Sequence, residues 1–340
     1  MDKKNVVLLG GSNSVIVNGL QRGLREGIEQ FNQDYSKKLK FHNFALGATT
    51  SLQNLYELKR DRNKIILENA KLIISESNIN DSFCYDNSKI YKTVELLFNE
   101  LSQFKTKILI LILPFFNLNS KIVNQIHKKL ALKFGFNIID INSYYENFNL
   151  SNFSFLREKD GSHQFDFIYK RLGNNIISNI EKLTICNSNN NSKFNLKICQ
   201  AKEIDETVVY NRSNSIFNEK CIRLFDSNLF KFPSKYEGFE LIGCHCWTTE
   251  EDSDIQAPLD WLGRRGIQGN ISIYNKNNKI SFEFCLDNIF IDINSSFYID
   301  KNTFINIRKK ALSYCDLIAF LLFSPRKTID DCDLNFKVLA

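Results

Sequence analysis

Two short stretches of this 340-residue chain carry residue types that together suit acyl-transfer chemistry. In the first, Gly10-Gly11-Ser12 follows an apolar run and precedes a segment with a helical pattern. A serine there lies at a strand–helix turn, where the free N–H groups of a helix N-terminus can stabilise an oxyanion. The same residues are also typical of an ordinary turn with a capping serine, so this stretch alone leaves both interpretations open.

The second stretch is Asp160-Gly161-Ser162-His163, in a loop that precedes the last helical segment of the first half of the chain. A histidine with an aspartate three residues earlier can act as a general base whose ring the acid orients. Taken alone, the pair is also typical of a capping or surface arrangement. His42 lies within a predicted strand and His127 within a predicted helix, and neither has an acid at useful spacing.

The elements that must position these residues alternate between strand and helix over the first ~185 residues. Apolar runs predict strands at 5–10, 39–46, 71–75, 107–113 and 137–140. Helical spacing predicts helices at 15–31, 51–69, 88–104, 119–134 and 164–183. This alternation predicts an α/β fold with a doubly wound parallel sheet. Ser12, Gly47 and Asn80 each follow a predicted strand, so all three should lie at the same edge of the sheet.

Four blocks in this order resemble those of the SGNH hydrolases, also called GDSL-like esterases. The blocks are Gly10-Gly11-Ser12-Asn13-Ser14, Gly47 after the second strand, Asn78-Ile79-Asn80-Asp81, and Asp160 to His163. The resemblance covers about residues 5–183 and implies a flavodoxin-like α/β/α domain.

The resemblance also implies a role for each matched residue. Ser12 is the expected nucleophile, His163 the base that activates it, and Asp160 the acid that orients His163. The backbone N–H groups of Ser12 and Gly47 and the side-chain amide of Asn80 are the expected oxyanion hole. This machinery needs no cofactor, and we expect no metal site.

The sequence departs from the family pattern at two positions. Gly11 stands where the family has an aspartate, and Asn78 stands where its third block has a glycine. We expect Asn80 to point into the site because an aspartate follows it directly. Ser14 remains an alternative nucleophile, and Glu76 is either a capping acid or a residue that supports the site.

The second half of the chain has a different pattern. A polar linker at 186–193 separates the predicted catalytic domain, 1–185, from a predicted β-rich accessory domain, 194–340. Short apolar runs between polar turns predict a sandwich-like arrangement of antiparallel strands. The predicted strands are 194–199, 207–210, 221–225, 238–244, 269–274, 279–286, 289–293 and 297–299, and the one predicted helix is 305–314.

Composition excludes several classes of protein. The net charge is +6, but the lysines are dispersed, so we expect no nucleic-acid partner. No run approaches the ~18 apolar residues of a membrane span. Nine cysteines without framework spacing, and no secretory signal at the N-terminus, predict reduced thiols and a cytoplasmic location. Cys244-His245-Cys246 lacks the ligand spacing of a zinc site.

These features together predict an SGNH-type serine esterase that removes or transfers a small acyl group, acetyl, on an acylated sugar or polysaccharide. The acceptor is water in a hydrolase and a sugar hydroxyl in a transferase, which would need an acyl donor such as acetyl-CoA. The alternative is a catalytically silent domain whose β-rich partner domain binds a glycan or a protein. Four aromatic residues of that domain either stack on sugar rings or pack in its core: Tyr236, Phe239, Trp247 and Trp261.

Overall fold

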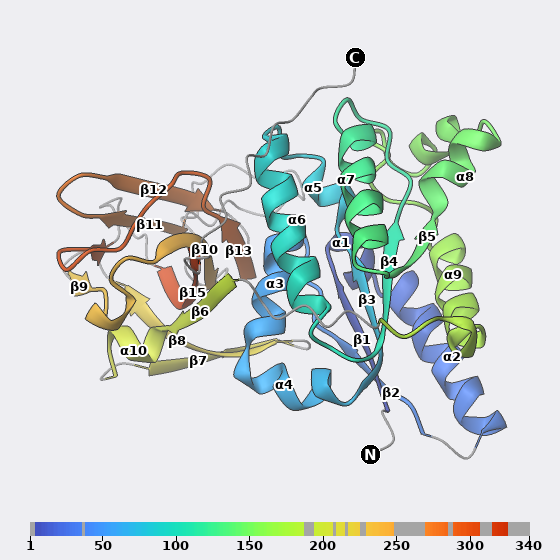
Figure 1. Ribbon diagram of the computed structural model, residues 1–340, viewed down its shortest axis with the longest axis horizontal. Coiled ribbons are helices and arrows are strands. Elements are labelled where there is room, and N and C mark those ends of the chain that lie inside the picture. The colour runs from blue at the N-terminus through green and yellow to red at the C-terminus, as the bar shows by residue number, and fades with distance from the viewer. Residues whose placement is uncertain are drawn as a thin grey trace, which may run out of the picture.

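The computed structural model describes residues 4–35, 38–186, 194–206, 209–214, 217–224, 229–247, 269–284, 288–306 and 315–325. An α/β part, up to residue 186, lies beside a β-rich part that begins at residue 194 (Figure 1). The polar segment at 187–193, predicted to be a linker, lies outside the described residues. The two parts together confirm the predicted fold class.

The α/β part is built on a five-stranded parallel sheet in the order β2-β1-β3-β4-β5. This is the flavodoxin-like strand order, in which the chain reverses its direction of winding beside β1. The strands are β1 (Asn5–Gly10), β2 (Lys40–Asn43), β3 (Ala70–Glu76), β4 (Lys107–Ile112) and β5 (Asn137–Asp140).

Helices cover both faces of this sheet (Figure 1). The helices are α1 (Ser12–Val15), α2 (Leu20–Asp34), α3 (Ser51–Lys59), α4 (Asp61–Glu68), α5 (Asn78–Asp81), α6 (Asn87–Leu101), α7 (Ser120–Lys133), α8 (Ile141–Asn147) and α9 (Asp166–Ser178). Successive residues of β1 point to opposite faces of the sheet, and each face is covered by its own helix layer. Val6 packs in a core with α2 and α9, and Val7 packs in a core with α3, α6 and α7. The helix predicted at 15–31 lies mostly within α2, but its predicted start is too early, because residues 16–19 between α1 and α2 are not helical.

Glycine allows α2 and α9 to touch backbone to backbone. A Cβ atom added at Gly23 of α2 would lie 1.9 Å from the Lys170 carbonyl oxygen of α9. A Cβ atom added at Gly173 would lie 2.6 Å from the Leu20 carbonyl oxygen. Because α2 follows the Ser12 turn and α9 follows the His163 loop, this contact also brings the two predicted catalytic stretches toward each other.

The β-rich part consists of two antiparallel sheets that share a core. One has the order β13-β10-β15-β8-β7 with β6 also paired to β15, and the other has the order β12-β11-β14-β9. Ile273 of β11 and Phe320 of β15, one from each sheet, lie in the same buried cluster. The strands are β6 (Phe194–Gln200), β7 (Val209–Ser213), β8 (Asn218–Leu224), β9 (Phe230–Lys231), β10 (Glu240–Trp247), β11 (Gly269–Tyr274), β12 (Lys279–Phe284), β13 (Asn288–Asp292), β14 (Phe304–Asn306) and β15 (Cys315–Pro325), and the helix α10 is Ala201–Ile204.

For the β-rich part, one prediction is wrong and another is contradicted only at its first two residues. The helix predicted at 305–314 begins within β14, and its remaining residues, 307–314, lie outside the described part of the chain. The predicted strand at 297–299 contributes only an isolated bridge between Tyr298 and Glu240. The sequence analysis also missed β15, which pairs with β6, β8 and β10.

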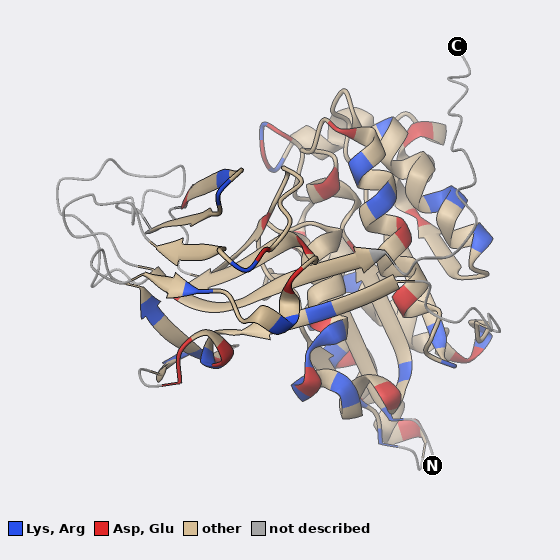
Figure 2. Ribbon diagram, turned by 60° about the vertical axis from the view of Figure 1, so that its left-hand side comes forward, with Lys and Arg blue, Asp and Glu red and all other residues tan. Residues whose placement is uncertain are grey.

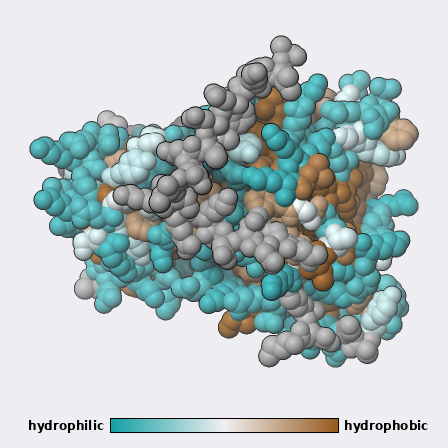
Figure 3. Space-filling model, viewed as in Figure 1, coloured by the Kyte–Doolittle hydropathy of each residue, from teal (hydrophilic) through white to brown (hydrophobic). Residues whose placement is uncertain are grey.

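The surface carries charges of both signs. Figure 2 shows Lys and Arg interspersed with Asp and Glu on the helices of the α/β part. On the face drawn in Figure 3, hydrophobic side chains gather over the α/β part, whereas the outer end of the β-rich part is mostly hydrophilic. Within the described residues, no helix combines the length and the apolar character that crossing a membrane requires.

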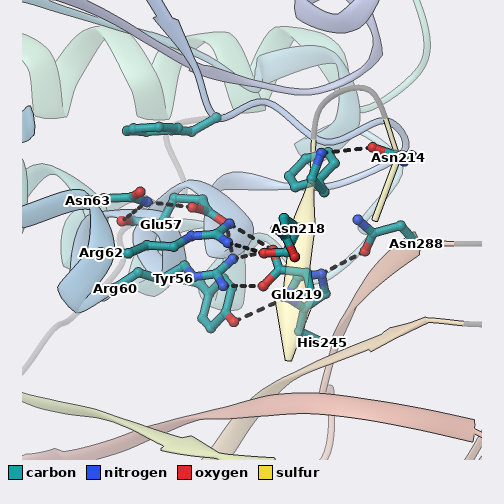
Figure 4. A network of polar contacts seen from close by, with 12 residues as sticks. Tyr56, Glu57, Arg60, Arg62, Asn63, Asn214, Asn218, Glu219, His245 and Asn288 are labelled. Atoms are coloured by element: carbon teal, nitrogen blue, oxygen red, sulfur yellow. Dashed lines mark hydrogen bonds and ion pairs between the residues drawn. The ribbon is translucent and has the colours of Figure 1, made fainter. Parts of the chain in front are cut away.

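A buried polar network joins the two parts (Figure 4). The Glu219 carboxylate on β8 accepts hydrogen bonds from Arg60, 2.9 Å from Nη1, and from Arg62, 2.7 Å from Nη2. Burial opposes ionisation of Glu219, but the two guanidinium groups outweigh it and lower the pKa of Glu219. Nearby, the Tyr56 hydroxyl lies 3.1 Å from His245 Nδ1 on β10.

We expect the substitution Glu219→Gln to destabilise the protein by about 1.5–3 kcal/mol, because it removes the charged hydrogen-bond partner of Arg60 and Arg62 and leaves the buried Arg60 with Glu57 as its one carboxylate partner among the described residues. The measurement is urea unfolding at neutral pH. The matched control is Glu26→Gln on the surface, where Glu26 pairs with Arg22 and Lys170, each at 2.9 Å, and where solvent screening should keep the loss far smaller. Equal losses in the two variants would contradict the importance of the buried network.

Candidate active site

Ser12 and His163 meet at the carboxyl edge of the parallel sheet. Ser12 is the first residue of α1, directly after β1 and Gly11. His163 precedes α9, and its Nε2 atom lies 2.8 Å from Ser12 Oγ. A second contact fixes the approach of the two segments, since Asn13 Nδ2 donates to the Ser162 carbonyl oxygen at 3.1 Å. Both side chains are partly exposed, so a substrate can reach them.

The acid beside His163 is Glu158, whose Oε2 atom contacts His163 Nδ1. Asp160 does not make this contact. Its Oδ1 atom accepts hydrogen bonds from the Ser162 backbone N–H at 3.0 Å and from the Ser162 hydroxyl at 2.9 Å. Glu158 therefore occupies the position beside His163 Nδ1 that was expected of Asp160. Asp160 instead bonds to Ser162 within the loop.

The turn that presents Ser12 rests on a buried carboxylate, that of Glu76 at the end of β3. Glu76 Oε2 accepts hydrogen bonds from the Ser14 hydroxyl at 2.9 Å and from the Gly11 N–H at 3.4 Å. Ser14 is fully buried and bonded to this acid, whereas Ser12 is the serine that faces His163. The geometry thus favours Ser12 over Ser14 as the nucleophile, and it gives Glu76 the supporting position.

The Glu76 side chain is fully buried, and its Oε1 atom has no hydrogen-bond partner among the described residues. Burial raises the pKa of Glu76 to about 7, although the Ser14 hydroxyl and the Gly11 N–H partly oppose this rise. The carboxyl group therefore titrates near neutral pH, directly beneath the turn that carries Ser12.

The Asn80 side chain lies over Gly11. A Cβ atom added at Gly11 would stand 2.8 Å from Asn80 Nδ2. A side chain at position 11 would thus require the Asn80 amide to shift. Glycine at position 11 leaves that space to Asn80, a predicted oxyanion donor.

Asn78 points away from the site into the α/β core. Its Nδ2 atom donates to the Leu113 carbonyl oxygen at 2.9 Å and to Asn124 Oδ1 at 2.8 Å. Its Oδ1 atom accepts the Leu113 N–H at 3.0 Å. Asn78 therefore ties the start of α5 to the end of β4, which leaves Asn80 as the asparagine placed toward Ser12.

Gly47, the third predicted donor, lies in the turn between β2 and α3. Its Cα atom faces α1, because an added Cβ atom would lie 3.8 Å from Val15 Cγ2. The preceding segment is bonded to the serine turn, through Leu46 N–H to the Gly10 carbonyl oxygen at 3.1 Å and Asn43 Nδ2 to the Ser14 carbonyl oxygen at 2.9 Å. These bonds hold the Gly47 turn beside Ser12.

Sequence reasoning missed the connection between the second and third blocks. Asp81 accepts hydrogen bonds from the Ser51 N–H at 2.8 Å and from the Ser51 hydroxyl at 2.6 Å, so it anchors the start of α3. His127, which the sequence analysis set aside, lies 2.8 Å from the same carboxylate through its Nε2 atom. The one signal for this role is the position of Asp81 directly after Asn80.

Most of the remaining candidates in the described β-rich part are buried. Cys244 and Cys246 are buried in the shared core of the two sheets, while His245 alternates to the other face and contacts Tyr56. Across the described residues no cluster of three or more His, Cys, Asp or Glu side chains could hold a metal ion. Trp247 and Tyr236 are only 4% and 7% exposed, so sugar stacking is wrong for both. Phe239 is half-buried against Tyr236, and Trp261 lies outside the described residues.

Comparison with known proteins gives matches only at the level of structure. No protein-family model and no curated protein sequence matches the chain. A two-domain esterase active on acetylated mannans, co-crystallised with mannopentaose, has a similar structure, with a TM-score of 0.62, 13% identity, and coverage of 96% of this chain and 92% of that chain. A second structure with that description, without mannopentaose, covers 95% and 92% at the same TM-score and identity.

A lipase/acylhydrolase from Enterococcus faecalis covers 54% of this chain and 100% of its own, with 16% identity and a TM-score of 0.42. The likeness to the two-domain esterase extends over both parts of the chain. The chain therefore has the fold of that two-domain esterase, with a flavodoxin-like α/β part joined to an antiparallel β-rich part.

We expect Glu158→Gln to lower kcat/KM for p-nitrophenyl acetate by at least about 10²-fold, because an amide cannot stabilise the imidazolium that forms on His163. The matched control is Asp160→Asn, which should cost less than about tenfold, since the aspartate bonds only to Ser162. Steady-state kinetics of both variants provide the measurement. A larger loss in Asp160→Asn would return the orienting role to Asp160.

We expect Glu76 to make stability depend on pH. Between about pH 4.5 and 7 the folded protein keeps the Glu76 proton and the unfolded chain releases it, so stability falls as pH rises. The contribution approaches about 1.4 kcal/mol per pH unit. Urea unfolding of Glu76→Gln at pH 5, 6, 7 and 8 should show a flatter profile than that of the wild type. The exposed Glu29→Gln serves as the control, and an unchanged slope in Glu76→Gln would contradict the expectation.

Proposed function

We propose that the protein is a serine esterase of SGNH type that acts on a small acyl group, acetyl, carried by a sugar or polysaccharide. The observation that carries the proposal is the 2.8 Å contact between His163 Nε2 and Ser12 Oγ. It joins residues 151 positions apart, at the sheet edge where α/β folds bind their ligands. This arrangement of nucleophile and base argues against a domain that has lost its chemistry.

The chemistry follows from the geometry. His163 Nε2 takes the proton of Ser12 Oγ as the oxygen attacks the ester carbonyl, and Glu158 stabilises the imidazolium. The negative charge that develops on the carbonyl oxygen is met by the predicted donors, the N–H groups of Ser12 and Gly47 and the amide of Asn80. His163 then gives this proton to the sugar oxygen as the bond from that oxygen to the carbonyl carbon breaks, so the sugar leaves as an alcohol and the acyl group stays on Ser12.

The identity of the acyl acceptor distinguishes two versions of this function. Water, activated by the same histidine, gives a hydrolase, and a sugar hydroxyl gives a transferase supplied by a donor such as acetyl-CoA. The carbohydrate substrate is supported by the likeness, over both parts of the chain, to an esterase described as active on acetylated mannans. We therefore propose the hydrolase acting on acetylated polysaccharide as the first version to test.

The test is hydrolysis of p-nitrophenyl acetate, and release of acetate from acetylated mannan, by the wild type and three variants. Ser12→Ala and His163→Ala should each lose at least about 10³-fold in kcat, because each removes a member of the reacting pair. Ser14→Ala should keep most of the activity, since its hydroxyl bonds to Glu76 instead of facing His163.

Full activity in Ser12→Ala would overturn the proposal. Absence of hydrolysis by the wild type, combined with covalent labelling of Ser12 by a fluorophosphonate, would favour the transferase. Absence of both would favour the silent binding domain.

A further inference from the structure

Helix α3 is the element of the α/β part that the β-rich part holds along its length. At its start, Thr50 Oγ1 donates to Asp292 Oδ2 of β13 at 2.6 Å. At its middle, the Tyr56 hydroxyl contacts His245 of β10. Just beyond its end, Arg60 pairs with Glu219 of β8 (Figure 4). Three strands of one sheet therefore fix the position of a single helix.

The first of these contacts lies close to the predicted oxyanion hole. Thr50 is the N-cap of α3 and follows Gly47 by three residues, and its hydroxyl oxygen accepts the Leu52 N–H at 3.2 Å. Burial raises the pKa of Asp292 to about 6, so the carboxyl group is mostly ionised at neutral pH and accepts a hydrogen bond from the Thr50 hydroxyl. A charged partner makes this hydrogen bond stronger than a neutral one.

The turn between Gly47 and Thr50 needs outside support. Ala48 adopts a φ of +57°, a left-handed conformation that costs a residue with a side chain about 1 kcal/mol or more. Strand β2 ends at Asn43, so no sheet pairing fixes the turn itself. Within the turn, the Thr49 hydroxyl donates to the Leu46 carbonyl oxygen at 2.6 Å. The rest of the turn's support comes from its two ends, which are the bonds to the serine turn before it and the start of α3 after it.

Adjacent residues at the start of α3 are held from opposite sides. Ser51 is bonded to Asp81 of the α/β part, and Thr50 is bonded to Asp292 of the β-rich part. Lys89 of α6 adds a bond to the same corner, with its Nζ atom 2.9 Å from the Ile293 carbonyl oxygen. The end of β13 is therefore attached both to the helix that follows Gly47 and to its neighbour α6.

We propose that Asp292 is a positioning residue for catalysis: by holding Thr50, the β-rich part fixes the Gly47 turn and keeps its N–H directed at the oxyanion. The proposal rests on the proposed function for its effect on rate. It makes the β-rich part a component of the catalytic machinery that does not have to touch the substrate.

The test compares Asp292→Leu, which removes the acceptor, with Asp292→Asn, which keeps an acceptor oxygen. We expect Asp292→Leu to lower kcat for p-nitrophenyl acetate at least about tenfold with KM changed less than twofold, because displacing a donor weakens transition-state binding. Asp292→Asn should retain most of the rate. Asp292→Ser, too short to reach Thr50, replaces the leucine variant if that variant does not fold.

The matched control is Tyr56→Phe, which removes an inter-part hydrogen bond six residues further along the same helix. It should leave kcat within about twofold, since the Gly47 turn keeps its anchor at Thr50. A rate loss in Tyr56→Phe as large as that in Asp292→Leu would mean that Asp292 only helps to hold the two parts together, and it would overturn the proposal.

Amide hydrogen exchange of residues 44–52 supplies a readout that does not depend on activity. Exchange there should be faster in Asp292→Leu and unchanged in Tyr56→Phe. Unchanged exchange, or faster exchange with full kcat, would overturn the proposal and leave the proposed function intact. A wild type without esterase activity would overturn the proposed function and the catalytic role of Asp292, while the exchange data would still decide whether Asp292 holds the turn.

Discussion

The hydrogen bond between Ser12 and His163 is the contact on which the proposed chemistry depends, and the fold is what brings its two residues together. Neither residue can do acyl-transfer chemistry alone, and 151 positions of sequence separate them. The parallel sheet closes most of that distance by bringing the carboxyl ends of its strands to one edge. The backbone contact between α2 and α9, which only glycine permits at Gly23 and Gly173, helps to align the two segments.

Below that contact the site is built in layers of hydrogen bonds. Glu76 holds the serine turn from beneath, and Asp81 joins the start of α3 to the segment that carries Asn80. Both carboxyl groups are buried and accept hydrogen bonds from hydroxyl and backbone N–H groups of neighbouring turns. The predicted oxyanion donors belong to three separate turns, so it is these buried acids that give them a fixed relation to one another.

The α/β fold could be predicted because its strands are short apolar runs separated by helical patterns. Ser12 and His163 could be placed because each stands in a short motif. Glu158 could not, since its partnership with His163 depends on how the 158–163 loop turns, and Asp160 has the expected spacing. The sequence also left open whether Ser14 is the nucleophile, because its hydrogen-bond partner Glu76 is 62 residues away.

In the β-rich part the prediction was weaker for a physical reason. Strand β15 is buried on both faces and therefore lacks the alternation of polar and apolar residues that marks a half-exposed strand. Its pairing with three other strands depends on long-range contacts that no local pattern encodes. The aromatic residues were ambiguous because stacking on a sugar and packing in a core demand the same side chains.

The proximity of Gly11 and Asn80 has a consequence for how motifs of this kind are compared. The two positions share one volume, so the residue at 11 sets how much room the amide at 80 has. Substitutions at the two sites should then be non-additive, and a score that treats each motif letter independently would penalise Gly11 as a lost aspartate. The effect of any residue at position 11 therefore has to be judged together with the position of the Asn80 side chain.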